Sequence, residues 1–154
     1  AHHYAKQGAT LGLAARRGES LLELVDVLPN RARHCVYPLD VTDHAALRIA
    51  AADFIRHAGG VDIVIANAGI SRGTLTEYTE DLDVFERILA TNVTATVATF
   101  SPFIEPMREQ AAAGSSQCRL VGIASVAGIR GLPGASAYSA SKAAVISYCE
   151  SLRV

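Results

Sequence analysis

The chain alternates between short apolar runs and longer stretches in which apolar residues recur at helical spacing. The apolar runs predict strands over residues 10–15, 34–41, 61–69 and 118–125. The helical spacing predicts helices over residues 4–9, 20–28, 44–60, 81–112 and 137–154. We expect Gly8 to end the first helix, Thr42 or Asp43 to cap the third, and Pro102 and Pro106 to kink or divide the long fourth one. Continuously apolar strands are typical of a parallel sheet covered on both faces, so the pattern predicts a doubly wound α/β fold.

Composition narrows the class of protein. The 154 residues suit one domain, and we expect a single domain over residues 1–154. Half of the residues are hydrophobic, which is enough for a core and argues against disorder. The formal net charge is −1 and no basic run occurs, which argues against a nucleic-acid partner. No apolar stretch reaches membrane-spanning length, so we expect no membrane partner.

The cysteines and histidines carry little pattern. Cys35, Cys118 and Cys149 are scattered and odd in number, which favours reduced thiols and a cytoplasmic location over a disulfide framework. The five histidines show no ligand spacing with cysteines or acids. We therefore expect no metal site.

Polar or turn-forming residues follow every predicted strand. These residues are Arg16, Arg17, Asp40, Asn67, Ala68, Gly69 and Ser125. The carboxyl ends of parallel strands meet at one edge of the sheet, and ligands of open α/β sheets bind beyond that edge. We expect these side chains to line one binding site.

The same residues resemble the short-chain dehydrogenase/reductase family. Asn67-Ala68-Gly69 is similar to the N-A-G turn of that family. Its catalytic tetrad is matched by Asn92 in TNV, Ser125, and Tyr138-x-x-x-Lys142, with the thirteen-residue step from Ser125 to Tyr138 also in place. The resemblance covers essentially all 154 residues. It implies a Rossmann-like fold and an NAD(P)-dependent oxidoreductase that acts on CH-OH or C=O groups of a small-molecule substrate.

One part of the family pattern is missing. The family begins with a strand and a T-G-x-x-x-G-x-G turn, and no such turn precedes AHHYAKQG. Members usually run to roughly 250 residues, still within the range of one domain. We therefore expect the chain to be part of a longer protein, without the first strand and its glycine turn and without the last strands.

The resemblance implies a role for each member of the tetrad. Tyr138 and Lys142 are four residues apart and share one helix face. A phenol titrates near pH ~10, and a nearby ammonium favours its phenolate, so Tyr138 would exchange a proton with the carbonyl oxygen. Lys142 would also bind the nicotinamide ribose. Ser125 would hydrogen-bond the substrate oxygen, and Asn92 would hold a water that relays protons.

Each of these residues also has an ordinary interpretation. The tyrosine and lysine suit any amphipathic helix, a serine at a strand end is often bonded by backbone, and Asn92 alone would indicate a local helix irregularity. Ser139 and Ser141 are interpreted as small residues for close packing, without a chemical role.

Cofactor choice depends on the end of the first predicted strand. NAD enzymes usually place an acid there, whereas this chain has Arg16 and Arg17, which suit a 2′-phosphate. NADP(H) is therefore preferred over NAD(H), with solvated surface arginines as the alternative. Asp40 and Val41 match the position that contacts adenine in the family. Residues 67–69 belong to the cofactor site as well, with Gly69 allowing close backbone approach.

The segment before Tyr138 is expected to border the substrate. Glycines at 128, 131 and 134 predict a flexible loop over the pocket. Residues expected to line the pocket are Ile70, Ser71, Ile129, Arg130 and Leu132.

These features favour an oxidoreductase that interconverts a ketone and a secondary alcohol with NADP(H). The alternative is a truncated or degenerate member that acts as a non-catalytic binding or assembly module, because the glycine turn for the pyrophosphate is missing. A sugar-nucleotide epimerase or dehydratase shares Tyr-x-x-x-Lys but usually needs a larger substrate domain. The resemblance also implies a homodimer or homotetramer formed through the helices at 81–112 and 137–154.

Overall fold

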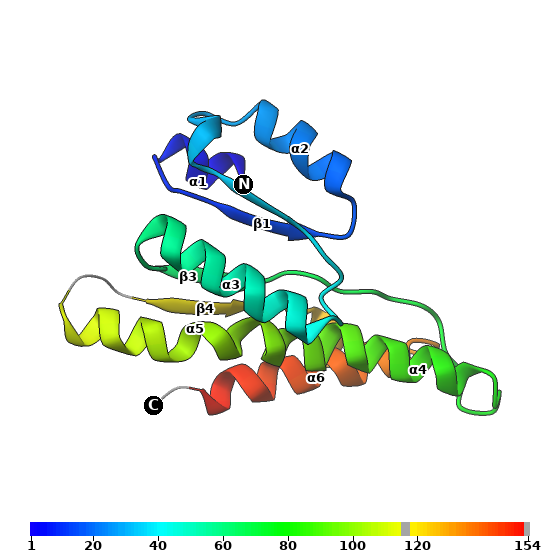
Figure 1. Ribbon diagram of the computed structural model, residues 1–154. Helices are drawn as coiled ribbons and strands as arrows, with labels where there is room; N and C mark the ends of the chain where they lie inside the picture. Colours follow the sequence, from blue (N-terminus) through cyan, green and yellow to red (C-terminus); the bar gives the residue numbers. More distant parts are fainter. Residues whose placement is uncertain (115–117, 153–154) are drawn as a thin grey trace.

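The computed structural model describes residues 1–114 and 118–152, and it shows strands and helices in alternation (Figure 1). The strands are β1 Gly12–Ala15, β2 Cys35–Pro38, β3 Ile63–Ala66 and β4 Arg119–Gly122. The helices are α1 His2–Lys6, α2 Gly18–Asp26, α3 His44–Ala58, α4 Asp81–Leu89, α5 Ala95–Ala112 and α6 Ser136–Ser151. Each predicted strand and helix is present, with shorter bounds for the strands.

The strands pair in parallel as two separate two-stranded sheets in the described part of the chain. β1 pairs with β2, and β3 pairs with β4. α2 packs on β1 and β2, α5 on β3, and α6 on β4. The predicted α/β architecture with parallel strands is confirmed, although the sheet is partial. β2, β3 and β4 end before their apolar runs do, so residues 67–69, Asp40 and Val41 lie in loops beyond the strand ends, whereas β1 ends with its run at Ala15.

Helix α3 connects the two strand pairs. The side chain of Asp43 caps it by accepting hydrogen bonds from the backbone N–H groups of Ala45 at 3.1 Å and Ala46 at 2.9 Å. Phe54 of α3 lies so close to Gly12 that a methyl group there would be 2.8 Å from the ring. The same Phe54 packs against the core cluster that contains Val64 and Phe100. β1 is thus tied to the β3–β4 half through one aromatic side chain.

The long helix predicted over 81–112 is interrupted, but not where the prolines lie. α5 continues through Pro102 and Pro106, so the expected division at the prolines is wrong. The irregularity is a π-helical turn at Ala90–Thr94, between α4 and α5. Such turns are frequent at functional sites. This one contains Asn92, which matches the helix irregularity considered for that residue.

The core lies between β3 and the helices that cover it. Its buried members are Val61, Val64, Ala66, Phe100 and Met107. Among the described helices, none is both long enough and apolar enough to cross a membrane.

Candidate active site

Helix α6 carries Tyr138 and Lys142 one turn apart, with the lysine side chain turned inward. Lys142 is only 5% exposed. Its Nζ donates a hydrogen bond to the carbonyl oxygen of Ile123 at 2.6 Å and lies 5.7 Å from the centre of the Tyr138 ring. An ammonium has three N–H donors, so donors remain for a bound ligand. The pair therefore has the geometry of a phenol placed beside a buried cation.

The turn after β3 lies directly against this lysine. A methyl group at Gly69 would be 3.5 Å from Lys142 Nζ and 3.4 Å from Asn92 Oδ1. The backbone of Gly69 thus borders a space shared by three segments: the turn after β3, the π-helical turn and α6. The role expected for Gly69 toward the cofactor stays a prediction.

Asn92 joins these three segments through its side chain, and it is 1% exposed. Its Oδ1 accepts a hydrogen bond from the backbone N–H of Ile70 at 2.8 Å. Its Nδ2 donates to the carbonyl of Ile70 at 2.9 Å and to Ser141 Oγ at 2.9 Å. Asn92 therefore fixes the loop after β3 against α6.

The two serines between Tyr138 and Lys142 do more than pack closely. Ser139 and Ser141 are buried, as expected of small packing residues. Each hydroxyl also makes hydrogen bonds that the sequence did not indicate. Ser141 Oγ accepts from Asn92 and donates to the carbonyl of Tyr138 at 2.7 Å, and Ser139 Oγ accepts from the N–H of Leu132 at 3.1 Å. The residue types alone did not show which groups these hydroxyls would bind.

Ser125 lies beyond β4, in a half-buried position. Its Oγ accepts a hydrogen bond from the N–H of Ala127 at 3.2 Å and so caps the 3-10 turn Val126–Gly128. A hydroxyl that accepts one bond still has its own hydrogen to donate. Ser125 can therefore donate to a substrate oxygen while it keeps its structural bond.

Gly128 presses this turn onto the backbone of α6. A methyl group at Gly128 would lie 2.6 Å from the carbonyl carbon of Lys142, 2.7 Å from its oxygen and 2.9 Å from the nitrogen of Ala143. Gly128 is therefore packed against α6 and is not part of the flexible loop expected over the pocket. Gly131 is different, because nothing lies within 4 Å of a methyl group placed there.

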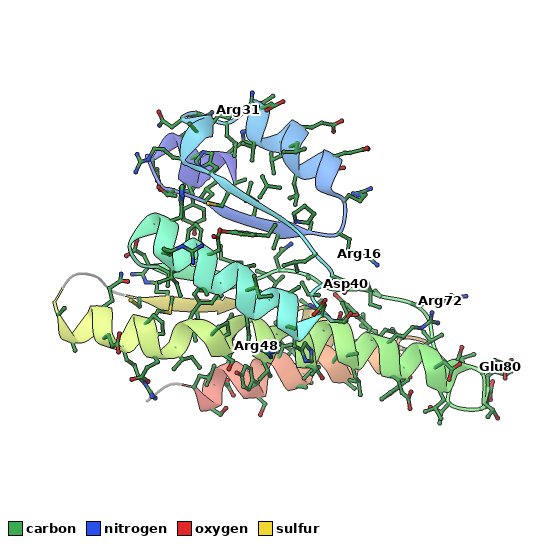
Figure 2. The ribbon with its side chains drawn as sticks, viewed as in Figure 1. Arg16, Arg31, Asp40, Arg48, Arg72 and Glu80 are labelled. Atoms are coloured by element: carbon green, nitrogen blue, oxygen red, sulfur yellow. The ribbon has the colours of Figure 1, made fainter. Side chains whose placement is uncertain are left out.

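The charged candidate cofactor residues after β1 and β2 have exposed side chains. Figure 2 shows Arg16 and Asp40 beside each other, and Arg16 Nη1 is 4.0 Å from Asp40 Oδ2. Thr42 donates to Asp40 Oδ1 from its backbone N–H at 2.9 Å and from its hydroxyl at 2.8 Å. These hydrogen bonds, with a smaller contribution from the Arg16 charge, lower the pKa of Asp40. Arg17 and residues 67–69 are exposed, and Val41 is half-buried.

A hollow of about 420 Å³ lies elsewhere. It is bounded by α5, β4 and α6, with Met107, Cys118, Leu120 and Cys149 among its lining residues. No member of the tetrad lines it. We identify the candidate site by the convergence of Asn92, Tyr138 and Lys142 with the Ser125 turn. Within the described part of the chain, no cluster of three His, Cys, Asp or Glu side chains could hold a metal ion.

The chain has relatives of known name and known structure. It is 41% identical over 117 residues to 2-dehydro-3-deoxy-L-rhamnonate dehydrogenase (NAD(+)) of Sphingomonas sp., which covers 76% of this chain and 45% of that protein. A short-chain dehydrogenase structure from Streptomyces avermitilis is 32% identical with a TM-score of 0.84, over 98% of this chain and 53% of that one. The structure of 3-ketoacyl-(acyl-carrier-protein) reductase from Brucella melitensis, complexed with NADH, is 25% identical with a TM-score of 0.89, over 98% of this chain and 61% of that one.

These alignments also set the extent of the match. The chain spans about half the length of the curated relatives it matches, at 45%, 57% and 60% of the first three. The family model described as short chain dehydrogenase matches residues 1–154, the whole chain. The chain belongs to the short-chain dehydrogenase family.

Proposed function

We propose that the protein transfers a hydride between NADP(H) and a ketone or secondary alcohol. The observation that carries the proposal is the convergence of Lys142, Asn92 and Gly69, with the Tyr138 ring 5.7 Å from the lysine ammonium. The nicotinamide cofactor, when bound, supplies or accepts the hydride. The residues of this chain bind and orient the reactants and move the proton.

Tyr138 is the proposed acid and base. Its hydroxyl gives a proton to the carbonyl oxygen during reduction and takes it back during oxidation. The buried Lys142 ammonium lies 5.7 Å from the centre of the Tyr138 ring, where its charge would attract negative charge that develops on the phenol oxygen during proton transfer. Lys142 keeps its position through the Ile123 carbonyl, and its other N–H groups would bind the nicotinamide ribose.

Ser125 and Asn92 complete the proposed tetrad. The Ser125 hydroxyl donates to the substrate oxygen and stabilises the charge that develops there. Asn92, through its bonds to Ile70 and Ser141, shapes the space next to Lys142 in which a relay water would sit.

The first test is cofactor oxidation by the full-length protein with a panel of ketones. Turnover of at least one ketone that depends on NADPH supports the proposal. Turnover that survives Tyr138→Phe without loss would refute the tyrosine mechanism.

Cofactor preference is a separate proposal. Arg16 and Arg17 follow β1, and no acid lies there, which fits the 2′-phosphate of NADP(H). The Sphingomonas relative is named for NAD(+), so the two cofactors have to be compared directly. We expect kcat/KM to be higher with NADPH than with NADH, and Arg16→Ala to reduce that ratio about tenfold, the size of one charged hydrogen bond. An unchanged ratio in Arg16→Ala would assign the preference to other residues.

The oligomeric state and the cellular location of the protein are two further proposals. We propose a homodimer or homotetramer through the helices at 81–112 and 137–154, supported by exposed apolar side chains such as Leu82 on α4 and Val97 on α5. Light scattering that gives a monomer would overturn this. We also propose a cytoplasmic location, where Cys35, Cys118 and Cys149 stay reduced.

A further inference from the structure

The catalytic helix begins without a cap from its own neighbouring residue. α6 starts at Ser136, and Ala135 at the N-cap position has no side chain that could accept a hydrogen bond. The first N–H groups of any helix lack partners within the helix. Here the hydroxyl of Thr74, from a loop 63 residues earlier in the chain, accepts a hydrogen bond from the N–H of Ala137 at 3.2 Å.

Thr74 is buried and is held in this position by several hydrogen bonds. It is 4% exposed. Its N–H donates to the carbonyl of Gly134 at 3.0 Å, its Oγ1 lies 2.9 Å from Ser136 Oγ, and Ser136 Oγ donates back to the Thr74 carbonyl at 3.4 Å. If the Thr74 hydroxyl donates to Ser136 Oγ, then both hydroxyl hydrogens and the Ala137 N–H each make one hydrogen bond. This network fixes the loop to the first turn of α6.

The same loop is held at its other end by the site. Asn92 binds both backbone groups of Ile70, and Gly69 lies beside Lys142. Tyr138 is the third residue of α6, next to the capped Ala137, whereas Lys142 is fixed one turn later by Ile123. The distance between phenol and ammonium therefore depends on how firmly the first turn is held.

We propose that Thr74 is a positioning residue that caps α6 and sets the placement of Tyr138 relative to Lys142. This rests on the proposed function, because it gives that placement a catalytic consequence. Thr74 acts through the helix and does not itself touch the reacting atoms.

The test uses three variants of the full-length protein. Thr74→Val keeps the shape of the side chain and removes the hydroxyl, Thr74→Ser keeps the hydroxyl, and Thr76→Val makes the same change at an exposed position of the same loop. Amide hydrogen exchange at Ala137 and Tyr138 reports the cap, and steady-state kinetics over a range of pH reports the placement.

For Thr74→Val we expect exchange at Ala137 to become about tenfold faster, the effect of losing a typical helix cap. We expect kcat to fall about 10-fold to 100-fold while the cofactor KM stays unchanged, because the phenol is misplaced. The pH–rate profile should change as well, because the phenol and the ammonium no longer keep the same separation. Thr74→Ser should restore all three properties, and Thr76→Val should match the wild type.

A Thr74→Val enzyme with the wild-type pH profile and exchange rates would overturn the proposal. So would a loss of activity that Thr74→Ser fails to rescue, because that loss would come from the methyl group and its packing. A wild-type protein that reduces no carbonyl compound would refute the proposed function instead. In that case the exchange rates still decide whether Thr74 caps α6.

Discussion

The candidate side chains of Arg16, Arg17 and Asp40, after β1 and β2, are exposed, whereas Asn92 and Lys142, in the π-helical turn and α6, are buried and hydrogen-bonded. The Arg16 and Asp40 side chains are 73% and 45% exposed and meet at 4.0 Å. Asn92 and Lys142 are 1% and 5% exposed and hold hydrogen bonds of 2.6–2.9 Å. A surface ion pair contributes little to stability, but a buried polar group that loses its partner is costly. The charges beside β1 and β2 can therefore change at small cost, whereas the buried polar groups of Asn92 and Lys142 cannot change freely.

The largest expected effect comes from comparing two tyrosines of α6, by measuring both kcat and the melting temperature. Tyr138→Phe removes one hydroxyl, and we expect kcat to fall by about 10² to 10⁴-fold, the usual contribution of a general acid or base. The melting temperature should stay close to that of the wild type, because the ring remains. Tyr148→Phe makes the same change on the same helix, where the ring stacks on Phe100 in the core. It should leave kcat unchanged, and equal losses in the two variants would contradict the assignment of Tyr138.

Asn92 tests the cost of the buried connections. Asn92→Ala leaves the N–H and C=O of Ile70 without their partner, and we expect the free energy of unfolding to fall by more than about 2 kcal/mol. Asn67→Ala provides the comparison, because Asn67 is exposed beyond β3. Its loss should not change the free energy of unfolding, although cofactor affinity can weaken. Denaturant titration of both variants measures the difference, and similar losses would remove the distinction between the two asparagines.

The sequence was sufficient to predict the order of strands and helices. The functional roles of the site residues that it indicated stay predictions. Apolar runs and helical periodicity are local signals, so β1 to β4 and α2 to α6 could be located from them. Their bounds were less accurate, because the apolar run 61–69 continues past Ala66 into a turn whose backbone no longer pairs. The irregular helix turn was placed at the prolines from a local rule, whereas packing keeps α5 continuous and the turn lies at Ala90–Thr94.

The connections within the site could not be predicted in the same way. The bonds of Asn92 to Ile70 and to Ser141, and of Thr74 to Ala137, join residues 22 to 63 positions apart. Thr, Ser and Asn are common in loops and helices, so their types alone do not reveal which pairs meet. Only the fold brings the loop after β3 against the first turn of α6.

Gly128 tests close packing beside the site. Gly128→Ala forces a methyl group against the backbone of Lys142 and Ala143, and overpacking of this kind costs about 1–3 kcal/mol. We expect lower stability together with a reduced kcat, because the turn that carries Ser125 has to move away from α6. Gly131→Ala is the matched control in the same loop, where a methyl group meets open space. Thermal unfolding and kinetics of both variants give the answer, and a neutral Gly128→Ala would show that the turn is free to shift.

Asp40 gives the smallest expected effect and tests the exposed half by pH. Its pKa in the folded protein is lowered, chiefly by the hydrogen bonds from Thr42 and less by Arg16, so the ionised form contributes to stability above the unfolded-state pKa of about 3.9. That contribution is lost as the pH falls through the lowered folded-state value, where the carboxylate takes up a proton. Asp40→Asn keeps an oxygen for Thr42 but removes the charge, so the wild type should be slightly more stable than the variant at neutral pH. The difference should shrink as the pH falls below about 3.9 and vanish below the lowered folded-state pKa, where the wild-type carboxylate is also neutral. Chemical denaturation at a series of pH values measures it, and a difference that stays constant into acid would mean that the charge of Asp40 does not stabilise this strand end.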